Sequence, residues 1–359
     1  MLTIVPTIDT EGFHGPQPFE QFILGEVSGS HEEWGVFRIL DICRRNRVSA
    51  TFFVDAYESV FWGEDKFRDL TRRLIDAGGD VQLHTHPEFC GPRNKGPREP
   101  VCVRLLGASQ GKRGAGRLRG PMAQLSFEHQ LGFLKAGMDM LTSWTGVAPV
   151  AHRAGGYSIN ADTVEALRSA GIALDSSMNI AHVNSQITWS RNAVVAREGI
   201  VELPVTVQDY VLRVPGFREI YRRTEKTDLN TCSLAELVAF VDFAVRNGLV
   251  LMNLFMHSYS LLRFDRRTSR SEPRAGDAQK LNRFLALMRK RSDVRVMNCV
   301  QALDRYRKAP DEFLGSDVVP ELNASAFILR HGAARLRRYS TLAQRPPNAK
   351  DEIRTSSTM

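Results

Sequence analysis

Two histidines one residue apart, His84 and His86, follow a short apolar run at residues 81–83. Along a β-strand, residues i and i+2 point to the same face, so both imidazoles can reach one metal ion. Imidazole nitrogens are common ligands of zinc and of other divalent transition metals. Two polar side chains at a strand end are the alternative explanation, and this pair alone does not decide between them.

Two carboxylates with the same spacing, Asp9 and Glu11, follow another apolar run, at residues 3–8. They can also share a direction along an extended chain. Carboxylates at the carboxyl end of a strand either cap a turn or belong to a site in the crevice beyond a parallel sheet. Taken alone, this pair favours the turn cap.

Apolar runs of strand length alternate with segments whose apolar residues recur at helical spacing. This alternation predicts a parallel sheet, closed or nearly closed into a barrel by crossover helices. The residues that follow the strands of such a barrel meet at one rim. The expected strands are residues 3–8, 50–54, 81–83, 149–152, 172–174, 200–207, 250–256 and 294–297, and the expected helices are residues 34–45, 67–77, 127–145, 162–170, 234–246 and 279–288.

Further polar side chains follow other expected strands. Arg153 and Tyr157 come after one of them, and Asp175 and His257 come after two others. Each has an ordinary structural explanation: an ion pair for Arg153, packing for Tyr157, a turn for Asp175 and a satisfied core histidine for His257. Carboxylates, imidazoles and an arginine at successive strand ends are a less probable coincidence than any one of them, so together they favour an active site.

In content and spacing these residues resemble the polysaccharide deacetylase family, carbohydrate esterase family four, which includes chitin, chitooligosaccharide and peptidoglycan deacetylases. The resemblance covers about the first three hundred residues, including a helical segment at residues 34–43 and the Ala-Thr-Phe-Phe run within residues 48–54. It implies an α/β fold, a distorted (β/α) barrel of seven or eight strands. It also implies a metal-dependent N-deacetylase that acts on an acetamido sugar.

The resemblance implies a role for each side chain at the rim. Asp9 matches the catalytic base, and Glu11, His84 and His86 take the places of the metal ligands. Zinc is the ion expected with such ligands, and cobalt, nickel and iron are the alternatives. An ion held by two imidazoles and one carboxylate keeps open positions, where a water becomes acidic enough to react near neutral pH.

The same resemblance extends to the remaining rim residues. Arg153 is similar to the arginine that orients the base, and Tyr157 to the tyrosine whose backbone N–H helps to hold the oxyanion. His257 is similar to the histidine that protonates the departing amine as general acid. Asp175 would be the carboxylate that orients His257.

Three motifs depart from the common family pattern. Thr-Phe-Asp-Asp-Gly has become Thr-Ile-Asp-Thr-Glu-Gly at residues 7–12, the histidine pair is compressed to His-Thr-His, and Arg-Pro-Pro-Tyr has become Arg-Ala-Gly-Gly-Tyr at residues 153–157. His14 and Glu88 are substitute ligands if one histidine points away. The chemical types are kept while the loops differ, so we expect hydrolysis to be retained on a substrate other than the usual extracellular glycans.

The composition bounds the architecture and the compartment. A chain of 359 residues with 43% hydrophobic residues is long enough for one large α/β domain. We expect this domain at residues 1–310, with a basic insertion at residues 91–121, and a C-terminal extension at residues 311–359 that is partly helical and then disordered. Five cysteines without Cys-X-X-Cys spacing, no basic-then-apolar leader and no apolar run of membrane-span length predict a cytoplasmic protein.

The net charge of +8 is concentrated in two loops. The insertion at residues 91–121 follows the histidine pair, and a second basic loop at residues 263–274 follows His257. Both can steer an anionic substrate to the rim, such as an acetamido sugar on a nucleotide diphosphate or lipid pyrophosphate, although a solvated loop explains each equally well. Basic charge without interleaved aromatic residues argues against nucleic-acid binding.

The segment at residues 324–342 combines apolar and arginine side chains in the pattern of a basic amphipathic helix. Such a helix can contact an anionic membrane surface from the cytoplasmic side, or a partner protein. A helix folded back on the barrel is the more ordinary interpretation of the same pattern.

Three functions remain open on the sequence. The first is a metal-dependent deacetylase of an acetamido sugar or glycan intermediate in cell-surface polysaccharide or glycoconjugate biosynthesis. The second is a metal-dependent hydrolase of a non-sugar amide on the same scaffold. The third is a catalytically silent glycan-binding or scaffold protein, which the presence of base, ligands and acid argues against.

Overall fold

The computed structural model describes residues 1–12, 19–30, 32–87, 121–213, 219–265, 268 and 270–330. Two compact units divide the chain. The first comprises Met1–Gln208 and Glu225–Pro320, and the second comprises Asp209–Thr224 and Glu321–Met359. The candidate residues 14, 88 and 91–120 lie outside the described part of the chain.

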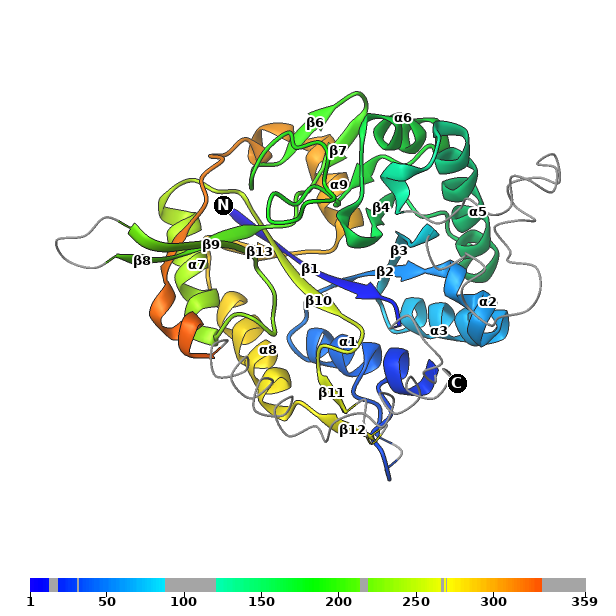
Figure 1. Ribbon diagram of the computed structural model, residues 1–359, viewed down its shortest axis with the longest axis horizontal. Coiled ribbons are helices and arrows are strands. Elements are labelled where there is room, and N and C mark those ends of the chain that lie inside the picture. The colour runs from blue at the N-terminus through cyan, green and yellow to red at the C-terminus, as the bar shows by residue number, and fades with distance from the viewer. Residues whose placement is uncertain are drawn as a thin grey trace, which may run out of the picture. The chain divides into compact units, whose positions relative to one another are not determined.

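A curled, largely parallel sheet of nine strands lies at the centre of the first unit. The strand order is β10-β1-β2-β3-β4-β5-β7-β6, and β13 also pairs with β1 (Figure 1). All of these strands except β6 are parallel to their neighbours. The strands are β1 (Leu2–Thr10), β2 (Thr51–Asp55), β3 (Asp80–Thr85), β4 (Ala151–Ala154), β5 (Leu174–Asp175), β6 (Val195–Arg197), β7 (Ile200–Glu202), β10 (Leu251–His257) and β13 (Val294–Val296). The expected distorted barrel of parallel strands is therefore confirmed.

Helices surround the strands of this unit, as crossover connections require (Figure 1). Amphipathic patterns place their apolar faces toward the sheet, for example through Phe67, Leu70 and Leu74 of α3. Ser126 caps the start of α5 and Ser233 that of α7, where the sequence pattern predicts both helices with their observed bounds. The helices are α1 (Val36–Arg45), α2 (Ser59–Trp62), α3 (Glu64–Asp76), α5 (Phe127–Thr145), α6 (Ala161–Ala170), α7 (Leu234–Arg246), α8 (Ala275–Met288) and α9 (Cys299–Lys308).

Short helical turns and a hairpin complete the first unit. The turns are η1 (Glu20–Leu24), η2 (Ala56–Glu58), η4 (Met122–Gln124), η5 (Gly155–Tyr157) and η6 (Pro310–Phe313). The hairpin pairs β11 (Leu262–Asp265) with β12 (Arg270–Pro273) in an antiparallel register. Two of the turns, η2 and η5, directly follow strands β2 and β4, so they lie at the carboxyl edge of the central sheet.

The apolar run at residues 200–207 does not form one strand, and that prediction is wrong. β7 ends at Glu202, and β8 (Val207–Arg213) belongs to a separate sheet with β9 (Glu219–Lys226) and β14 (Glu321–Asn323). Pro204 stands between β7 and β8. It has no backbone N–H to donate to a neighbouring strand, so the run is interrupted there.

The second unit is small. β14 pairs in parallel with residues 209–211 of β8, and residues 324–330 are helical. The ring of Phe327 stacks on Tyr210 with 4.0 Å between centroids, and Arg222 forms ion pairs with Asp209, Glu219 and Glu321. The predicted helix at residues 324–342 is thus described only to residue 330, and its expected disordered end lies outside the described residues.

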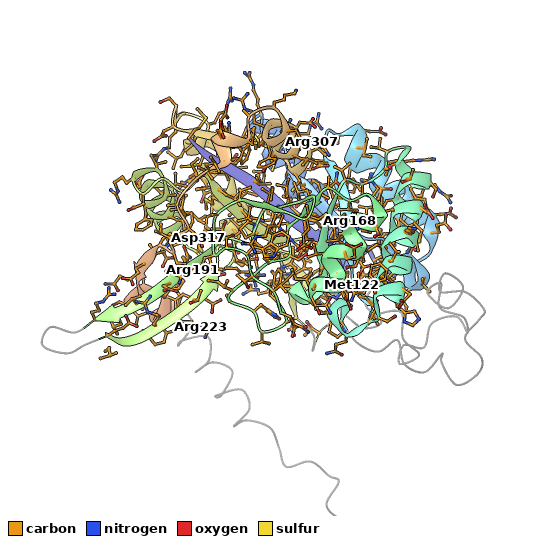
Figure 2. All side chains as sticks on the ribbon, turned by 90° about the horizontal axis from the view of Figure 1, so that it is seen from above. Met122, Arg168, Arg191, Arg223, Arg307 and Asp317 are labelled. Carbon is orange, nitrogen blue, oxygen red and sulfur yellow. The ribbon has the colours of Figure 1, made fainter. Side chains whose placement is uncertain are left out.

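The barrel unit extends past residue 310, where we expected a C-terminal extension to begin. Asp317 accepts three backbone hydrogen bonds, from the N–H groups of residues 191, 192 and 193, at 2.7, 2.7 and 3.0 Å. Figure 2 shows Asp317 beside Arg191. These bonds tie residues 311–320 to the barrel unit, so the boundary between the two units falls after Pro320.

Candidate metal centre and active site

The register of the central sheet aligns the candidate residues in one row. Asp9 pairs with His257 across β1 and β10, and His84 pairs with Arg153 across β3 and β4. Paired residues in a parallel sheet lie side by side, at the carboxyl ends of their strands. The topology therefore brings together side chains that are up to 248 positions apart in the chain.

Glu11, His84 and His86 form a compact group of three ligand atoms. Glu11 Oε2 lies 2.6 Å from His86 Nε2 and 3.1 Å from His84 Nε2. One ligand atom from each residue lies within 4.8 Å of the other two, which fits coordination of a single ion. Burial raises the pKa of Glu11, but the charge of His86 and the hydrogen bonds from both imidazoles outweigh it and hold that pKa well below its usual value.

His84 is oriented by a backbone carbonyl. Its Nδ1 donates a hydrogen bond to the Arg153 carbonyl oxygen at 2.8 Å, which leaves Nε2 to face Glu11. A histidine that ligates a metal usually donates its other ring N–H in this way, which fixes the tautomer and the ring plane. Burial lowers the pKa of His84, but Asp9 and Glu11 together raise it above the usual histidine value.

Arg153 holds Asp9 from the interior of the barrel. Its Nη1 donates to Asp9 Oδ1 at 2.7 Å and to Thr7 Oγ1 at 3.0 Å, while Nε and Nη2 donate to the carbonyl and hydroxyl oxygens of Ser176. The guanidinium is fully buried and lies 4.4 Å from the centroid of the Phe53 ring. The hydrogen bond to Asp9 that the predicted role of Arg153 requires is thus present. The other carboxylate oxygen of Asp9, Oδ2, lies 4.0 Å from His84 Nε2.

His257 stands beside the ligand group. Its Nε2 lies 3.6 Å from Glu11 Oε1, and its side chain is 23% exposed. The ring stacks on Tyr259 with 4.8 Å between centroids. Burial, and then the positive charge of Lys226, lower the pKa of His257 below the usual histidine value. The position suits transfer of a proton at the rim, and the role of general acid stays a prediction.

Tyr157 closes the η5 turn with a strained backbone. Its φ is +58°, a left-handed conformation that a tyrosine adopts at a cost. The phenol oxygen accepts a hydrogen bond from Lys226 Nζ at 2.9 Å, and that ammonium lies 3.3 Å from the centroid of the Phe255 ring. Sequence reasoning missed Lys226, because it lies on β9 rather than at the end of a strand of the central sheet. The predicted use of the Tyr157 backbone N–H in an oxyanion hole stays a prediction.

Asp175 does not have the partner that we expected. Its Oδ1 accepts hydrogen bonds from His152 Nδ1 at 2.8 Å and from Ser177 Oγ at 2.7 Å, so it orients His152 instead of His257. The reason is the register, which pairs His152 with Asp175 across β4 and β5. The charged groups that act on His257 are Lys226 and the carboxylates of Glu11, Asp9 and Asp228.

Two buried carboxylates that interact electrostatically with the ligand group, Asp55 and Glu58, were also missed. Asp55 ends β2 in register with His84; its Oδ1 accepts the Tyr57 N–H, while its Oδ2 has no hydrogen-bond partner among the described residues. Burial raises the pKa of Asp55 to about 7. Glu58 accepts the N–H of Gly12 with both oxygens, at 3.1 and 2.9 Å, and so holds the turn after Glu11. Asp55 follows an expected strand directly, so the strand-end rule would have included it.

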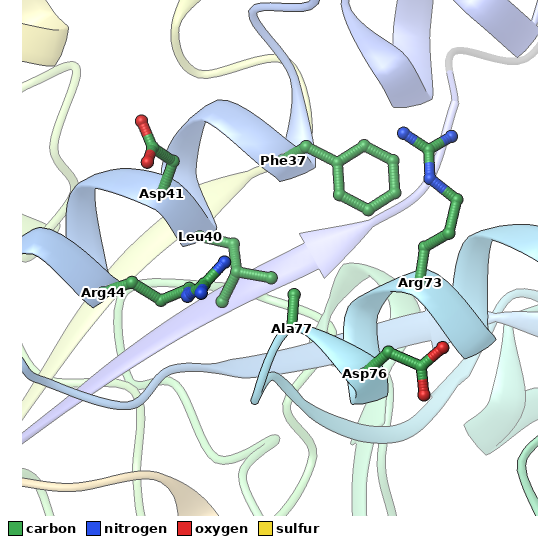
Figure 3. A pocket seen from close by; sticks show the side chains of 7 residues that line it. All are labelled: Phe37, Leu40, Asp41, Arg44, Arg73, Asp76 and Ala77. Atoms are coloured by element: carbon green, nitrogen blue, oxygen red, sulfur yellow. The ribbon is translucent and has the colours of Figure 1, made fainter.

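A separate pocket of about 410 Å³ lies on the outside of the barrel unit, between α1 and α3 (Figure 3). Figure 3 shows that helix side chains line it, with Phe37 and Leu40 between acidic and basic groups. None of the rim residues contributes to it, so it is not the candidate active site. No helix in the described part of the chain is long and apolar enough to cross a membrane.

Comparisons with solved structures agree with this architecture. The chain is similar to a structure assigned as a polysaccharide deacetylase from Mycobacterium smegmatis, with 20% identity, a TM-score of 0.50, and 89% of this chain and 95% of that chain covered. It is also similar to 4-α-glucanotransferase from Thermococcus litoralis, with 9% identity, a TM-score of 0.50, and coverage of 85% and 40%. For Puue allantoinase the identity is 12%, the TM-score 0.49, and the coverage 86% and 90%. No protein-family model and no curated protein sequence matches the chain.

These likenesses concern the fold. The barrel is of the polysaccharide deacetylase type, which confirms the fold that the sequence motifs imply. A glucanotransferase shares the same general architecture, so the fold does not choose the reaction. Activity and substrate therefore have to be argued from the rim residues.

Proposed function

We propose that this protein is a metal-dependent hydrolase that removes the N-acetyl group from an acetamido sugar or glycan intermediate. The observation that carries the proposal is the group of Glu11, His84 and His86, with Glu11 Oε2 within 3.1 Å of both Nε2 atoms. The donor set of two imidazoles and one carboxylate fits zinc first, and cobalt, nickel or iron as alternatives. A divalent ion held there supplies Lewis-acid polarisation of the acetamide carbonyl and lowers the pKa of a water that it binds.

The chain's own residues supply the proton transfers. Asp9 accepts the proton of the attacking water, while Arg153 keeps the other oxygen of that carboxylate hydrogen-bonded and the carboxyl group oriented. The water oxygen forms the new bond to the carbonyl carbon, and the bond from that carbon to nitrogen breaks. His257 donates a proton to the departing nitrogen, so that acetate and a free amine leave. Tyr157 contributes its backbone N–H to the oxyanion.

The substrate part of the proposal rests on charge and compartment. We place the protein in cell-surface polysaccharide or glycoconjugate biosynthesis, acting in the cytoplasm on an acetamido sugar with an anionic carrier, a nucleotide or a lipid pyrophosphate. The sequence supports this through the basic insertion at residues 91–121 and the basic segment from residue 324, which would contact an anionic membrane surface. Among the described residues, the thiols of Cys43 and Cys299 are buried and form no disulfide, which suits a reducing compartment.

Acetate release tests the proposal directly. The purified chain is stripped of metal, reloaded with Zn²⁺ or Co²⁺, and assayed on a nucleotide-linked N-acetylhexosamine, a chitooligosaccharide and a non-sugar acetamide. We expect metal-dependent release from the nucleotide-linked sugar, and loss of this activity in Asp9→Asn. Release from the non-sugar amide alone would favour a different hydrolase on this scaffold. No release from any substrate with either metal would favour a catalytically silent binding protein.

The charge of the insertion has its own test. Replacing Arg113, Arg117 and Arg119 with serine should lower kcat/KM for the anionic substrate at low salt, with the difference shrinking as salt screens the charges. Values of kcat/KM that are unchanged at every salt concentration would remove the steering role.

A further inference from the structure

The turn that follows β4 is packed against the second histidine of the candidate metal centre. A β-carbon at Gly155 would lie 2.3 Å from three ring atoms of His86, namely Cε1, Nδ1 and Nε2. Real β-carbons essentially never approach another heavy atom so closely. The His86 imidazole thus occupies the space that a side chain at position 155 would need.

The backbone of Gly155 does not itself require glycine. Its φ lies outside the left-handed region, unlike that of the neighbouring Gly156, whose φ is +55°. A side chain at position 155 would therefore be acceptable to the chain conformation. What excludes it is the ring of His86.

The ring of His86 has little freedom to move aside. Its Nε2 is 2.6 Å from Glu11 Oε2, and its plane stands at 78° to the ring of His84, with 4.9 Å between centroids. The side chain of His86 is 8% exposed. A β-carbon at position 155 would have to push the ring by about 1 Å to reach ordinary van der Waals contact. Metal–ligand distances tolerate only about 0.2 Å, so the imidazole would leave its ligand position.

The strand register explains why these two residues meet. Thr85 pairs with Ala154 at the end of β3 and β4, so the next residue along each strand, His86 and Gly155, comes side by side. The short His-Thr-His spacing places the second imidazole at this position, and the Ala-Gly-Gly turn leaves it room. The short His-Thr-His spacing and the Ala-Gly-Gly turn are therefore matched to each other in the structure.

We propose that Gly155 is a positioning residue of the metal centre, whose missing side chain sets the place of the His86 imidazole. This inference rests on the metal centre of the proposed function. It is independent of the substrate, because it concerns metal binding alone. Gly155 does not contact the ion; it acts through the ring of His86.

A double-mutant cycle tests the inference. The variants are Gly155→Ala, His86→Ala and the pair together, with Gly276→Ala as a matched control, because a β-carbon at Gly276 meets nothing within 4 Å and that glycine lies in α8. The affinity for Zn²⁺ is measured by competition with a chromophoric chelator, and the ligand field by the visible spectrum of bound Co²⁺. Urea unfolding of the metal-free wild type, the two single variants and the double variant gives the coupling energy between positions 86 and 155.

We expect Gly155→Ala to weaken Zn²⁺ binding by about 10- to 100-fold, as for other changes that misplace a ligand, and to alter the Co²⁺ spectrum. Gly276→Ala should change neither. In the metal-free proteins, Gly155→Ala should lower the urea midpoint when His86 is present and leave it nearly unchanged when residue 86 is alanine, because the opposing ring is then absent. If Gly155→Ala alone does not fold, recovery of folding in the double variant gives the same answer.

Two results would overturn the inference. The first is a Gly155→Ala protein with the Zn²⁺ affinity and Co²⁺ spectrum of the wild type. The second is an equal loss of stability, or of folding, from Gly155→Ala in both backgrounds, which would make the residue merely structural. A wild-type chain that binds neither ion would instead contradict the metal centre of the proposed function, so the two failures are distinguishable.

Discussion

The two ends of the barrel unit both carry arginine–carboxylate pairs, but these pairs are buried to different degrees. At the carboxyl ends of the strands, the guanidinium of Arg153 is fully buried on Asp9. At the amino end, Arg295 reaches from the middle of β13 to Thr3 and Glu312, and its side chain is 15% exposed. Arg305 pairs with the same carboxylate, and its side chain is 48% exposed. Buried charges are held in one geometry by everything packed around them, whereas exposed pairs are screened by solvent. In this chain the fully buried pair of Arg153 and Asp9 belongs to the candidate active site, whereas the exposed pair of Arg305 and Glu312 does not.

The largest effect should come from Arg153→Met. It leaves the Asp9 carboxylate buried without its partner, which costs about 3–5 kcal/mol of the free energy of unfolding. Urea denaturation measures this loss, with Arg305→Met at the amino end as the matched control. A loss no larger than that of the control would erase the contrast between the two ends.

Substitutions within the rim should separate base from ligand. Asp9→Asn is expected to lower kcat by about 100- to 10,000-fold while the protein still binds Zn²⁺, because its role is proton transfer. His84→Ala is expected to lose both activity and tight Zn²⁺ binding, since it removes one of three ligands. Acetate release and chelator competition on the same preparations give the two readouts. If Asp9→Asn lost the metal as well, the roles of Asp9 and Glu11 would have to be exchanged.

A smaller effect is expected for Asp175→Asn. The change weakens the hydrogen bonds that Asp175 accepts from His152 and Ser177, at about 1–3 kcal/mol of the free energy of unfolding. The pH dependence of kcat should keep its shape, because Asp175 does not contact His257 in the described structure. If the pH at which kcat falls off differed between Asp175→Asn and the wild type, the original expectation that this carboxylate orients the general acid would be restored.

The smallest effect should come from Glu312→Gln at the amino end. Hydrogen bonds from Arg305, and then from Arg295, lower the pKa of Glu312 from 4.5 to about 2. A carboxyl group whose pKa is depressed on folding stabilises the fold above its unfolded pKa, and this contribution is lost as the pH falls through the folded pKa. The variant should therefore unfold at a slightly lower temperature than the wild type at pH 7, and the difference should vanish as the pH approaches about 2. A difference that persists at that pH would mean that charge is not its source.

Much of the fold could be predicted, because local patterns carry it. Continuous apolar runs mark buried parallel strands, and β1 is buried along its whole length. Apolar residues at helical spacing between cap residues mark α5 and α7. The hydrophobic pattern gave a wrong prediction where strand pairing, which depends on distant residues, decides the structure. Residues 200–207 look like one strand, but β7 and β8 pair with different partners.

The candidate site shows the same division. Asp9, Glu11, His84 and His86 could be predicted because each lies at the carboxyl end of a strand of the central sheet, either in its last two residues or directly after it. The partner of Asp175 could not, since it depends on which residue of β4 lies opposite in the register. Lys226 was missed because it reaches the rim from β9, and Glu58 because it lies in η2, a turn that follows β2.

The sequence by itself determined the chemical types at the rim and the order of the strands that carry them, because hydrophobic period and residue identity are local properties. Only the tertiary structure decided which atoms meet. Strand register placed His152 beside Asp175 and the ring of His86 over Gly155, and the curl of the sheet brought Arg153 of β4 to Asp9 of β1. Such contacts depend on distances of a few ångströms between segments far apart in the chain, and these distances are set by the packing of the whole barrel unit.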